Sequence, residues 1–474
     1  MFIKNLSKNM KTYLFALFVL FFLFVLFTSL GQINRWDLLQ QIAMADNFLM
    51  SGSLYPDINN PGSSDVSPYF PGVALLGILI AKIGFSSNLV EIMLGIASIT
   101  IFLFFFIQYK IAQYLFGQNI TPYKFVPIVV ISSLFLFPEW FKYAAEFKPD
   151  ILALTIGFIC MHLVLHREVK ATYFQVIIGG LIAGLAIIFK QQYLAFIIGL
   201  SCQAIIFPTK KRILFSLSAL IIIIGVFTII YYNENAWFWS VEILKDDGFE
   251  PLKILLFNHF NMSIPIVSLL VFYFGYIKFV GGYFSTKISY PGLNFKDLFS
   301  SPWAWGTSFS ILAALASTFK AGGNSGNTEL GLILSLPLFA LLLSYMKEWV
   351  LIAIAMIAVY AHVPQIYLSI KNYNNALELL KFIESDALPG NLSIASGSNV
   401  YFAARKYNSS GRTAAYWPIS LINNNHPREG IDTVIQSFNP QILITDGFVD
   451  GAVVATDHNY TLVFRNAIGS VLMK

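Results

Sequence analysis

Long apolar runs are the feature of this sequence that most restricts how it can fold. A helix that crosses a bilayer needs about 20 mostly apolar residues, and about eleven runs approach or reach that length. They cover residues 12–31, 87–108, 124–138, 150–166, 173–189, 192–208, 212–232, 261–281, 303–319, 329–346 and 348–365. Only 12% of the residues are charged, against roughly 25% in an average soluble domain, which excludes a soluble globular enzyme and a disordered chain. The sequence therefore predicts an α-helical polytopic membrane protein.

A further apolar segment, residues 69–84, decides the orientation. If it does not cross the membrane, the short basic loops share the side of the N-terminal lysines; if it crosses, they all move to the other side. These loops contain Lys110, Arg167, Lys170, residues 210–212 and Lys347. Basic residues favour cytoplasmic loops, so we expect 69–84 to be a juxtamembrane or re-entrant helix within a long outer loop, 32–86. The N-terminus is then cytoplasmic and the C-terminus extracytoplasmic (periplasmic), in what we expect to be a bacterial inner membrane.

The chain becomes polar after about residue 365. An amphipathic helix is expected at 373–384, strands at 392–395 and 441–445, a helix at 432–438, and a hairpin of 460–465 with 470–473. Alternating helices and strands of this length are typical of a small α/β domain. We therefore expect two domains, a transmembrane domain of residues 1–365 and an extracytoplasmic domain of residues 366–474.

Polar residues on the expected outer side are the candidates for chemistry, because charges next to a bilayer are costly. Asp37 follows the first span directly and starts a stretch, Leu38–Met50, with helical spacing of apolar residues. It is either a helix N-cap, where Asp is favoured, or a catalytic carboxylate. Asp46 is expected on the exposed face of the same helix.

Basic residues at three outer turns form the second group of candidates. Asp150 suits a helix start, whereas Lys148 opposes the helix dipole there and would suit an anion. Lys190 and Gln191 occupy a tight turn between two spans, as an anion site or as a lysine that extends to the interface. A glycine-containing loop, which is either a binding loop or a simple connection, carries Lys320, Asn324, Asn327 and Glu329.

Several kinds of site are missing from the sequence. It has no phosphate-binding loop of the P-loop type and no dinucleotide-binding glycine motif. The six histidines have no metal-ligand spacing, and the two cysteines, Cys160 and Cys202, both lie in apolar runs. The spans carry few of the paired charges that an ion-coupled transporter needs.

The order of these features resembles the polyprenyl-phosphate-dependent glycosyltransferases of the GT-C class. The branch it resembles is glycosyltransferase family 39, with the protein O-mannosyltransferases and the aminoarabinose transferases. The matching elements are Asp37 after the first span, the segment 69–73 (Tyr-Phe-Pro-Gly-Val), Lys148-Pro149-Asp150, the segment 189–192 (Phe-Lys-Gln-Gln) and the loop 322–327. The resemblance covers about residues 10–365. Family members often have Asp-Glu in the first outer loop, whereas Leu38 follows Asp37 here, so no cofactor is firmly implied and a divalent metal ion stays open.

The resemblance implies an inverting transfer of a sugar from a polyprenyl-phosphate donor to a lipid, glycan or protein acceptor at the outer face, within membrane lipids and without nucleic acid. It implies Asp37 as the base and Lys190 as the main phosphate partner, assisted by Lys148 or Lys320. Asp150, Gln191, Asn324, Asn327 and Glu329 are the further substrate-binding candidates. Two alternatives are a flippase or transporter of lipid-linked oligosaccharides and a non-catalytic membrane scaffold.

Overall fold

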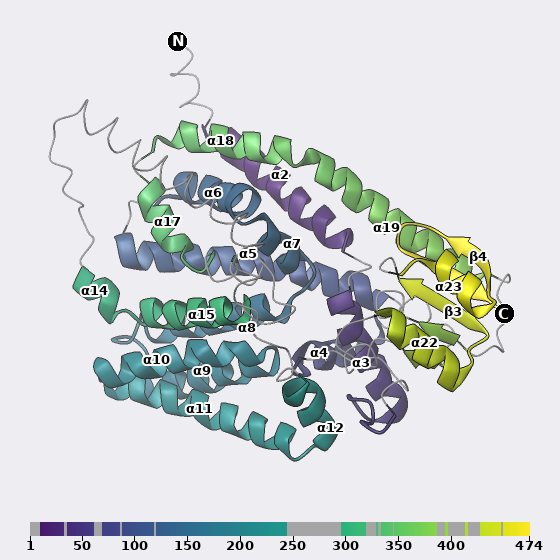
Figure 1. Ribbon diagram of the computed structural model, residues 1–474. Coiled ribbons are helices and arrows are strands. Elements are labelled where there is room, and N and C mark those ends of the chain that lie inside the picture. Colours follow the sequence, from purple (N-terminus) through teal and green to yellow (C-terminus); the bar gives the residue numbers. More distant parts are fainter. Residues whose placement is uncertain are drawn as a thin grey trace, which may run out of the picture.

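The structure is a computed structural model, and it is mostly helical (Figure 1). It describes residues 10–32, 36–60, 69–85, 88–117, 120–243, 295–318, 329, 333–344, 346–385, 394–396, 413–415, 427–446 and 449–474. The predicted span 261–281 lies outside the described residues.

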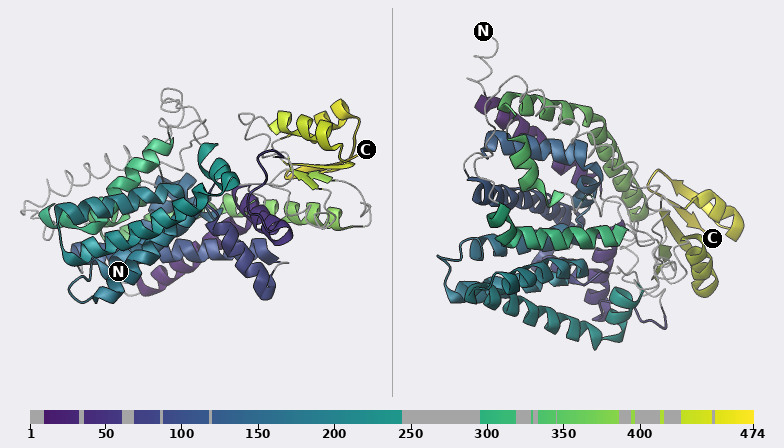
Figure 2. Two further views of the ribbon diagram at one scale, coloured as in Figure 1. Left: turned by 90° about the horizontal axis from the view of Figure 1, so that it is seen from below. Right: turned by 60° about the vertical axis from the view of Figure 1, so that its left-hand side comes forward.

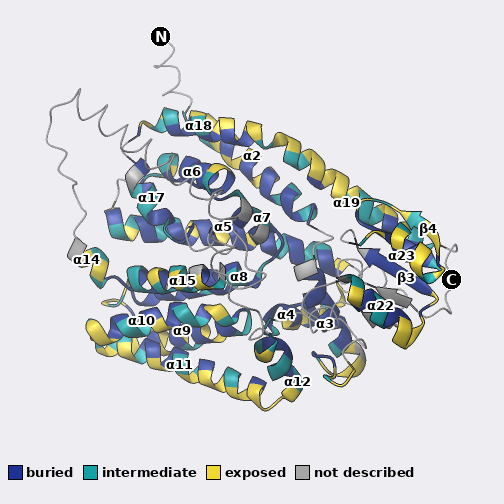
Figure 3. Cartoon of the chain, viewed as in Figure 1, coloured by how far each residue is buried: buried dark blue, intermediate teal, exposed yellow. Residues whose placement is uncertain are grey.

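The helices form a bundle with apolar outer faces. Its main members are α2 (Met10–Leu30), α5 (Leu89–Phe116), α6 (Pro122–Ile131), α8 (Pro149–Val164), α9 (Tyr173–Leu185), α10 (Leu194–Ile206), α11 (Lys210–Tyr231), α15 (Pro302–Thr318), α17 (Leu336–Leu343), α18 (Glu348–Ala361) and α19 (Val363–Glu384). Among the described residues, four helical stretches are long and apolar enough to cross a membrane, and five more are apolar but shorter. Large apolar side chains such as Ile229, Ile205 and Tyr360 are 73%, 76% and 80% exposed, as Figure 3 shows for α11 and α18. Such surfaces suit a lipid environment, and the number of eleven spans stays a prediction.

The region around residue 365 differs from the prediction. We expected a span to end there and a separate helix to begin at 373, but α19 starts at Val363, one residue after α18, and continues to Glu384. Pro364 is tolerated in the first turn of α19, and nothing breaks the helix before 384. Residue 366 therefore lies inside a helix, not in a linker. Within the predicted span 329–346, α17 covers Leu336–Leu343 with Pro337 in its first turn, and Glu329 and Ile333 are helical as well.

A five-stranded sheet lies at the end of the bundle that carries the short helix α12 (Glu234–Trp237) (Figure 1). Its strands are β1 (Ile394–Ser396), β2 (Thr413–Ala415), β3 (Ile442–Asp446), β4 (Thr461–Arg465) and β5 (Gly469–Met473), in the order β2-β1-β3-β5-β4. β1 pairs in parallel with β2 and β3, and β5 pairs antiparallel with β3 and β4. The predicted hairpin is thus confirmed.

The sheet is packed between helices (Figure 2). Ile442 and Ile444 contact Leu379 and Ile383 of α19 on one face. Leu443, which points to the other face, packs with α22 (Pro427–Phe438) and α23 (Gly451–His458), as the two-residue period of a strand requires. Since α19 also packs against α2, one continuous helix joins the bundle to the sheet.

Two further helices, α3 (Trp36–Ser51) and α4 (Gly72–Ile80), lie between the bundle and the sheet. The predicted helix Leu38–Met50 is confirmed. Both helices bury apolar side chains against the start of α5, and Tyr373 and Ala376 of α19 pack on the same cluster. Asp46 is only 4% exposed, so the prediction of an exposed position is wrong. Helices α4 and α5 both cover α3, so little of α3 reaches the surface.

Candidate functional site

A buried lysine lies in the turn between α9 and α10. A 3-10 turn, Ala186–Ile188, follows α9, and Lys190 has an extended backbone before a second 3-10 turn opens α10. Lys190 is only 6% exposed. A lysine is almost never buried to this extent unless it is paired, which is against the alternative of a lysine that extends to the interface.

Lys190 has two partners, and both come from segments singled out in the sequence. Its Nζ lies 3.4 Å from Oδ2 of Asp150, in the first turn of α8. It also lies 3.6 Å from the centre of the Tyr69 ring, well within the range of a cation–π interaction. The carboxylate suits the positive end of the α8 dipole as well, so one acidic residue stabilises both the helix start and the ammonium.

Close backbone packing holds Tyr69 over Lys190. Gly72, the first residue of α4, lies against the turn that precedes Lys190. A Cβ at Gly72 would lie 2.8 Å from the carbonyl oxygen of Ile188 and 2.7 Å from Cδ1 of Phe189. Only glycine allows this approach, because the Ile188 contact is with backbone that cannot rotate away.

We expect Gly72→Ala to lower stability by about 1–3 kcal/mol, the usual cost of forcing extra volume into a packed site. Gly95→Ala in α5 is the matched control, because a Cβ there meets nothing within 4 Å and alanine favours helix. Thermal unfolding in detergent compares the two. Equal melting temperatures for both variants would contradict the close packing of α4 on the turn.

A chain of hydrogen bonds runs from the Lys190 turn through the segment between α3 and α4. Nε2 of Gln191 donates to the Ser240 carbonyl oxygen at 2.7 Å. The Ser240 hydroxyl donates to the Tyr55 hydroxyl at 3.0 Å, and that hydroxyl donates to the Tyr69 carbonyl oxygen at 3.0 Å. Burial raises the pKa of Tyr55, so the phenol stays protonated and keeps its donor. The chain therefore returns to Tyr69, whose ring covers Lys190.

Removing the Tyr55 hydroxyl should loosen this chain. Tyr55→Phe leaves the Tyr69 carbonyl oxygen and the Ser240 hydroxyl without their partner, so we expect a loss of about 1–3 kcal/mol. Tyr367→Phe is the control, since Tyr367 is 69% exposed. Thermal unfolding and limited proteolysis of the 52–60 loop report the effect. A Tyr55→Phe protein as stable and protease-resistant as the control would show that the chain is not needed.

The charged pair lines a small pocket with a cavity volume of about 30 Å³. Its walls are Asp150, Leu154, Lys190, Gln192, Tyr193, Ser310, Ala313, Ala314, Ser317 and Leu334. Tyr193 is 3% exposed, and its hydroxyl has no hydrogen-bond partner within the described ranges. The Lys190 ammonium at this pocket is a donor of the kind that binds anionic oxygens.

Some of the other predicted site residues have a defined position in the structure, and the rest lie outside the described residues. Lys148 takes the N-cap position of α8. Glu329 is 5% exposed, and its Oε2 accepts the backbone N–H of Trp140 at 2.7 Å, near the start of α7 (Pro138–Ala145). Asp37 lies in the first turn of α3, one residue after its start. Lys320, Asn324 and Asn327 lie outside the described residues.

No sequence pattern singles out Tyr55 or Ser240, because each looks like an ordinary loop residue. They are 185 residues apart and meet only through the fold. Across the described part of the chain, no group of three or more acidic, histidine or cysteine side chains could hold a metal ion.

A solved structure of another protein has a similar fold. The chain is similar to ArnT from Cupriavidus metallidurans, crystallised with undecaprenyl phosphate, with a TM-score of 0.57 and 10% identity over 96% of this chain and 97% of that one. The chain has a GT-C fold. This confirms the resemblance in the sequence at the level of fold.

The oligosaccharyltransferase of Archaeoglobus fulgidus is less similar. Its apo form gives a TM-score of 0.41 and 12% identity, over 90% of this chain and 69% of that one. Its complex with Zn and sulfate gives a TM-score of 0.38 and 12% identity, over 88% and 64%. No protein-family model and no curated protein sequence matches the chain.

Proposed function

We propose that this protein is a membrane glycosyltransferase that moves a sugar from a polyprenyl-phosphate donor to an acceptor at the outer face. One observation carries the proposal: three segments far apart in the sequence, 69–72, 148–150 and 189–192, meet at the Lys190 ammonium. The GT-C fold supports it, and so does the undecaprenyl phosphate held by the structurally similar ArnT.

In the proposed reaction, Asp37 takes the proton of the acceptor group as that oxygen or nitrogen attacks the anomeric carbon. The bond from this carbon to the phosphate oxygen breaks, and polyprenyl phosphate leaves with the electron pair. A single displacement inverts the anomeric centre. The leaving group is already an anion, so the enzyme needs a base and cations but no general acid.

Lys190 is the proposed main partner of the donor phosphate, with Lys148 or Lys320 assisting. Asp150 positions Lys190, and Gln191 anchors the turn through Ser240. Asn324, Asn327 and Glu329 are proposed to bind sugar hydroxyls. The chemistry assigned to these residues needs no metal ion, although a divalent cation at the donor phosphate stays open.

The test is a transfer assay with purified protein in liposomes and a panel of polyprenyl-phosphate sugars, with and without candidate acceptors. We expect release of polyprenyl phosphate from at least one donor. Translocation of a fluorescent lipid-linked sugar without its cleavage would instead favour a flippase. Neither cleavage nor translocation, with no donor bound, would favour a scaffold.

The proposal includes a topology. The N-terminus and the loops around Arg167 and Lys211 would be cytoplasmic, and the region 366–474 would form an extracytoplasmic domain. Accessibility labelling of single cysteines at Val169 and Val453, two exposed positions at opposite ends of the protein, would test it. Labelling of both from the same side would contradict the proposed orientation.

A further inference from the structure

A groove runs between α8 and α9, away from the Lys190 site. Its cavity volume is about 690 Å³, and most of its wall is apolar. Leu163 and Phe174, which line it, are 53% and 72% exposed. Six of the wall residues are Ile156, Cys160 and Leu163 of α8 and Phe174, Ile178 and Ile182 of α9.

Two cations lie at the mouth of this groove. Arg167 and Lys170 belong to the loop between α8 and α9, both are exposed, and no acidic residue lines the groove. In the described part of the chain, neither side chain has a carboxylate partner. The N-terminus of α9, capped by Thr172 and Gln175, adds the positive end of a helix dipole nearby.

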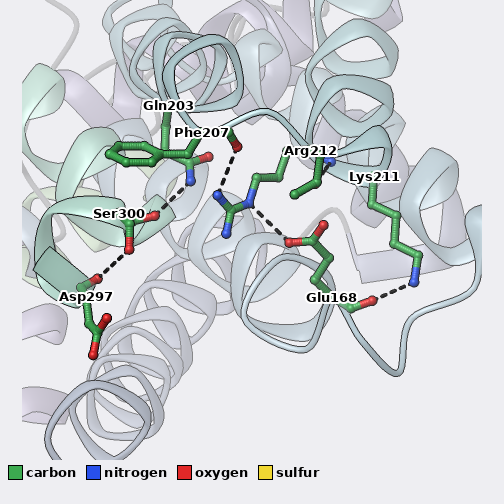
Figure 4. Close-up of polar contacts among 8 residues, drawn as sticks. Glu168, Gln203, Phe207, Lys211, Arg212, Asp297 and Ser300 are labelled. Atoms are coloured by element: carbon green, nitrogen blue, oxygen red, sulfur yellow. Dashed lines mark hydrogen bonds and ion pairs between the residues drawn. The ribbon is translucent and has the colours of Figure 1, made fainter.

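Lys211 and Arg212, at the start of α11, hold this loop through Glu168 (Figure 4). Its one acidic residue, Glu168, is already bound: Nε of Arg212 lies 3.1 Å from its Oε2. Nζ of Lys211 donates to the Glu168 carbonyl oxygen at 2.6 Å. The start of α11 therefore fixes the loop. Because the Glu168 carboxylate already pairs with Arg212, it does not neutralise Arg167 or Lys170.

We propose that this groove binds an anionic phospholipid, with its phosphate on Arg167 and Lys170 and an acyl chain along α8 and α9. Charge complementarity and apolar walls argue for this occupant, since basic pockets between membrane helices suit anionic headgroups. The wall from Ile156 to Val164 is about 12 Å long at 1.5 Å per residue, close to the roughly 15 Å of one leaflet.

This site is distinct from the proposed donor site. Asp150 and Arg167 lie at opposite ends of α8, roughly 25 Å apart by helix rise. A lipid in the groove therefore belongs to the leaflet opposite Lys190. The groove would bind its lipid whether or not the protein transfers sugar, so the two proposals fail independently.

The experiment measures bound lipid by native mass spectrometry of the full chain, released from mixed nanodiscs of phosphatidylglycerol and phosphatidylcholine with matched acyl chains. We expect preferential retention of phosphatidylglycerol, and a loss of about tenfold or more in that preference for Arg167→Gln/Lys170→Gln. The control is Lys210→Gln/Lys347→Gln, which removes two exposed charges at the same end of the bundle but outside the groove.

The control should keep the wild-type preference. An equal loss in both double variants would overturn the proposal, because it would mean a general attraction to basic loops. No headgroup preference in the wild type would also overturn it, and would leave the groove to another segment of this chain or to a second copy. The headgroup preference of the wild-type protein tests the proposal even if a variant folds poorly.

Discussion

Replacement of Asp37 by asparagine is expected to lower the turnover number for sugar transfer by about 10²–10⁴-fold, the usual contribution of a positioned general base. The amide has nearly the shape of the carboxylate but accepts no proton at neutral pH. Donor binding should persist, because the proposed phosphate partners are lysines. The measurement is turnover with saturating donor, together with donor binding by the same protein.

This substitution also distinguishes a catalytic Asp37 from an Asp37 that only stabilises the start of its helix. In the first turn of α3, asparagine would lose only the favourable interaction of the carboxylate with the helix dipole, about 0.3–1 kcal/mol, so a purely structural Asp37 would tolerate the change. Asp57→Asn is a suitable control, since Asp57 accepts the backbone N–H of Asn59 in an exposed turn and asparagine can do the same. Full transfer activity in a normally inserted Asp37→Asn protein would refute the assignment of the base.

Sequence patterns located the segments of the candidate site but not their contacts. Hydropathy and charge placed Tyr69, Asp150 and Lys190 on one side of the bundle, since both signals are local. The contact of Lys190 with both partners depends on how α4 and α8 pack, and local sequence patterns do not predict this packing. The same limit explains Asp46, whose burial comes from helices α4 and α5 and not from its own sequence neighbours.

The helix that runs past residue 365 differs from the prediction for another reason. Hydropathy reports where apolar residues stop, whereas a helix stops only where its backbone hydrogen bonds stop. In α19 the two do not coincide, because no glycine or internal proline follows Pro364 before Glu384. The strands at 441–445 and 460–473 were predicted well, because strand alternation and the turn between them are short-range signals.

Loss of the Lys190 charge is the second substitution with a large expected effect. Lys190→Met keeps the apolar stem and removes the ammonium, so the donor phosphate loses one charge-assisted hydrogen bond. Such bonds are worth about 1.5–3 kcal/mol, and we expect the apparent KM for the donor to rise by about 10- to 150-fold. Lys210→Met, which removes an exposed charge at the far end of α11, should leave the KM unchanged.

Lys190→Met alone is not decisive, because it also leaves Asp150 without its partner. Breaking a buried ion pair costs about 3–5 kcal/mol, and with side chains 8% and 15% exposed this pair should approach that range. Asp150→Asn added to Lys190→Met removes the unpaired carboxylate, so the double variant should regain most of the lost stability. Its donor KM should stay high, because the phosphate still lacks the ammonium. A double variant with a normal donor KM would mean that Lys190 only neutralises Asp150, and the phosphate would then need another cation.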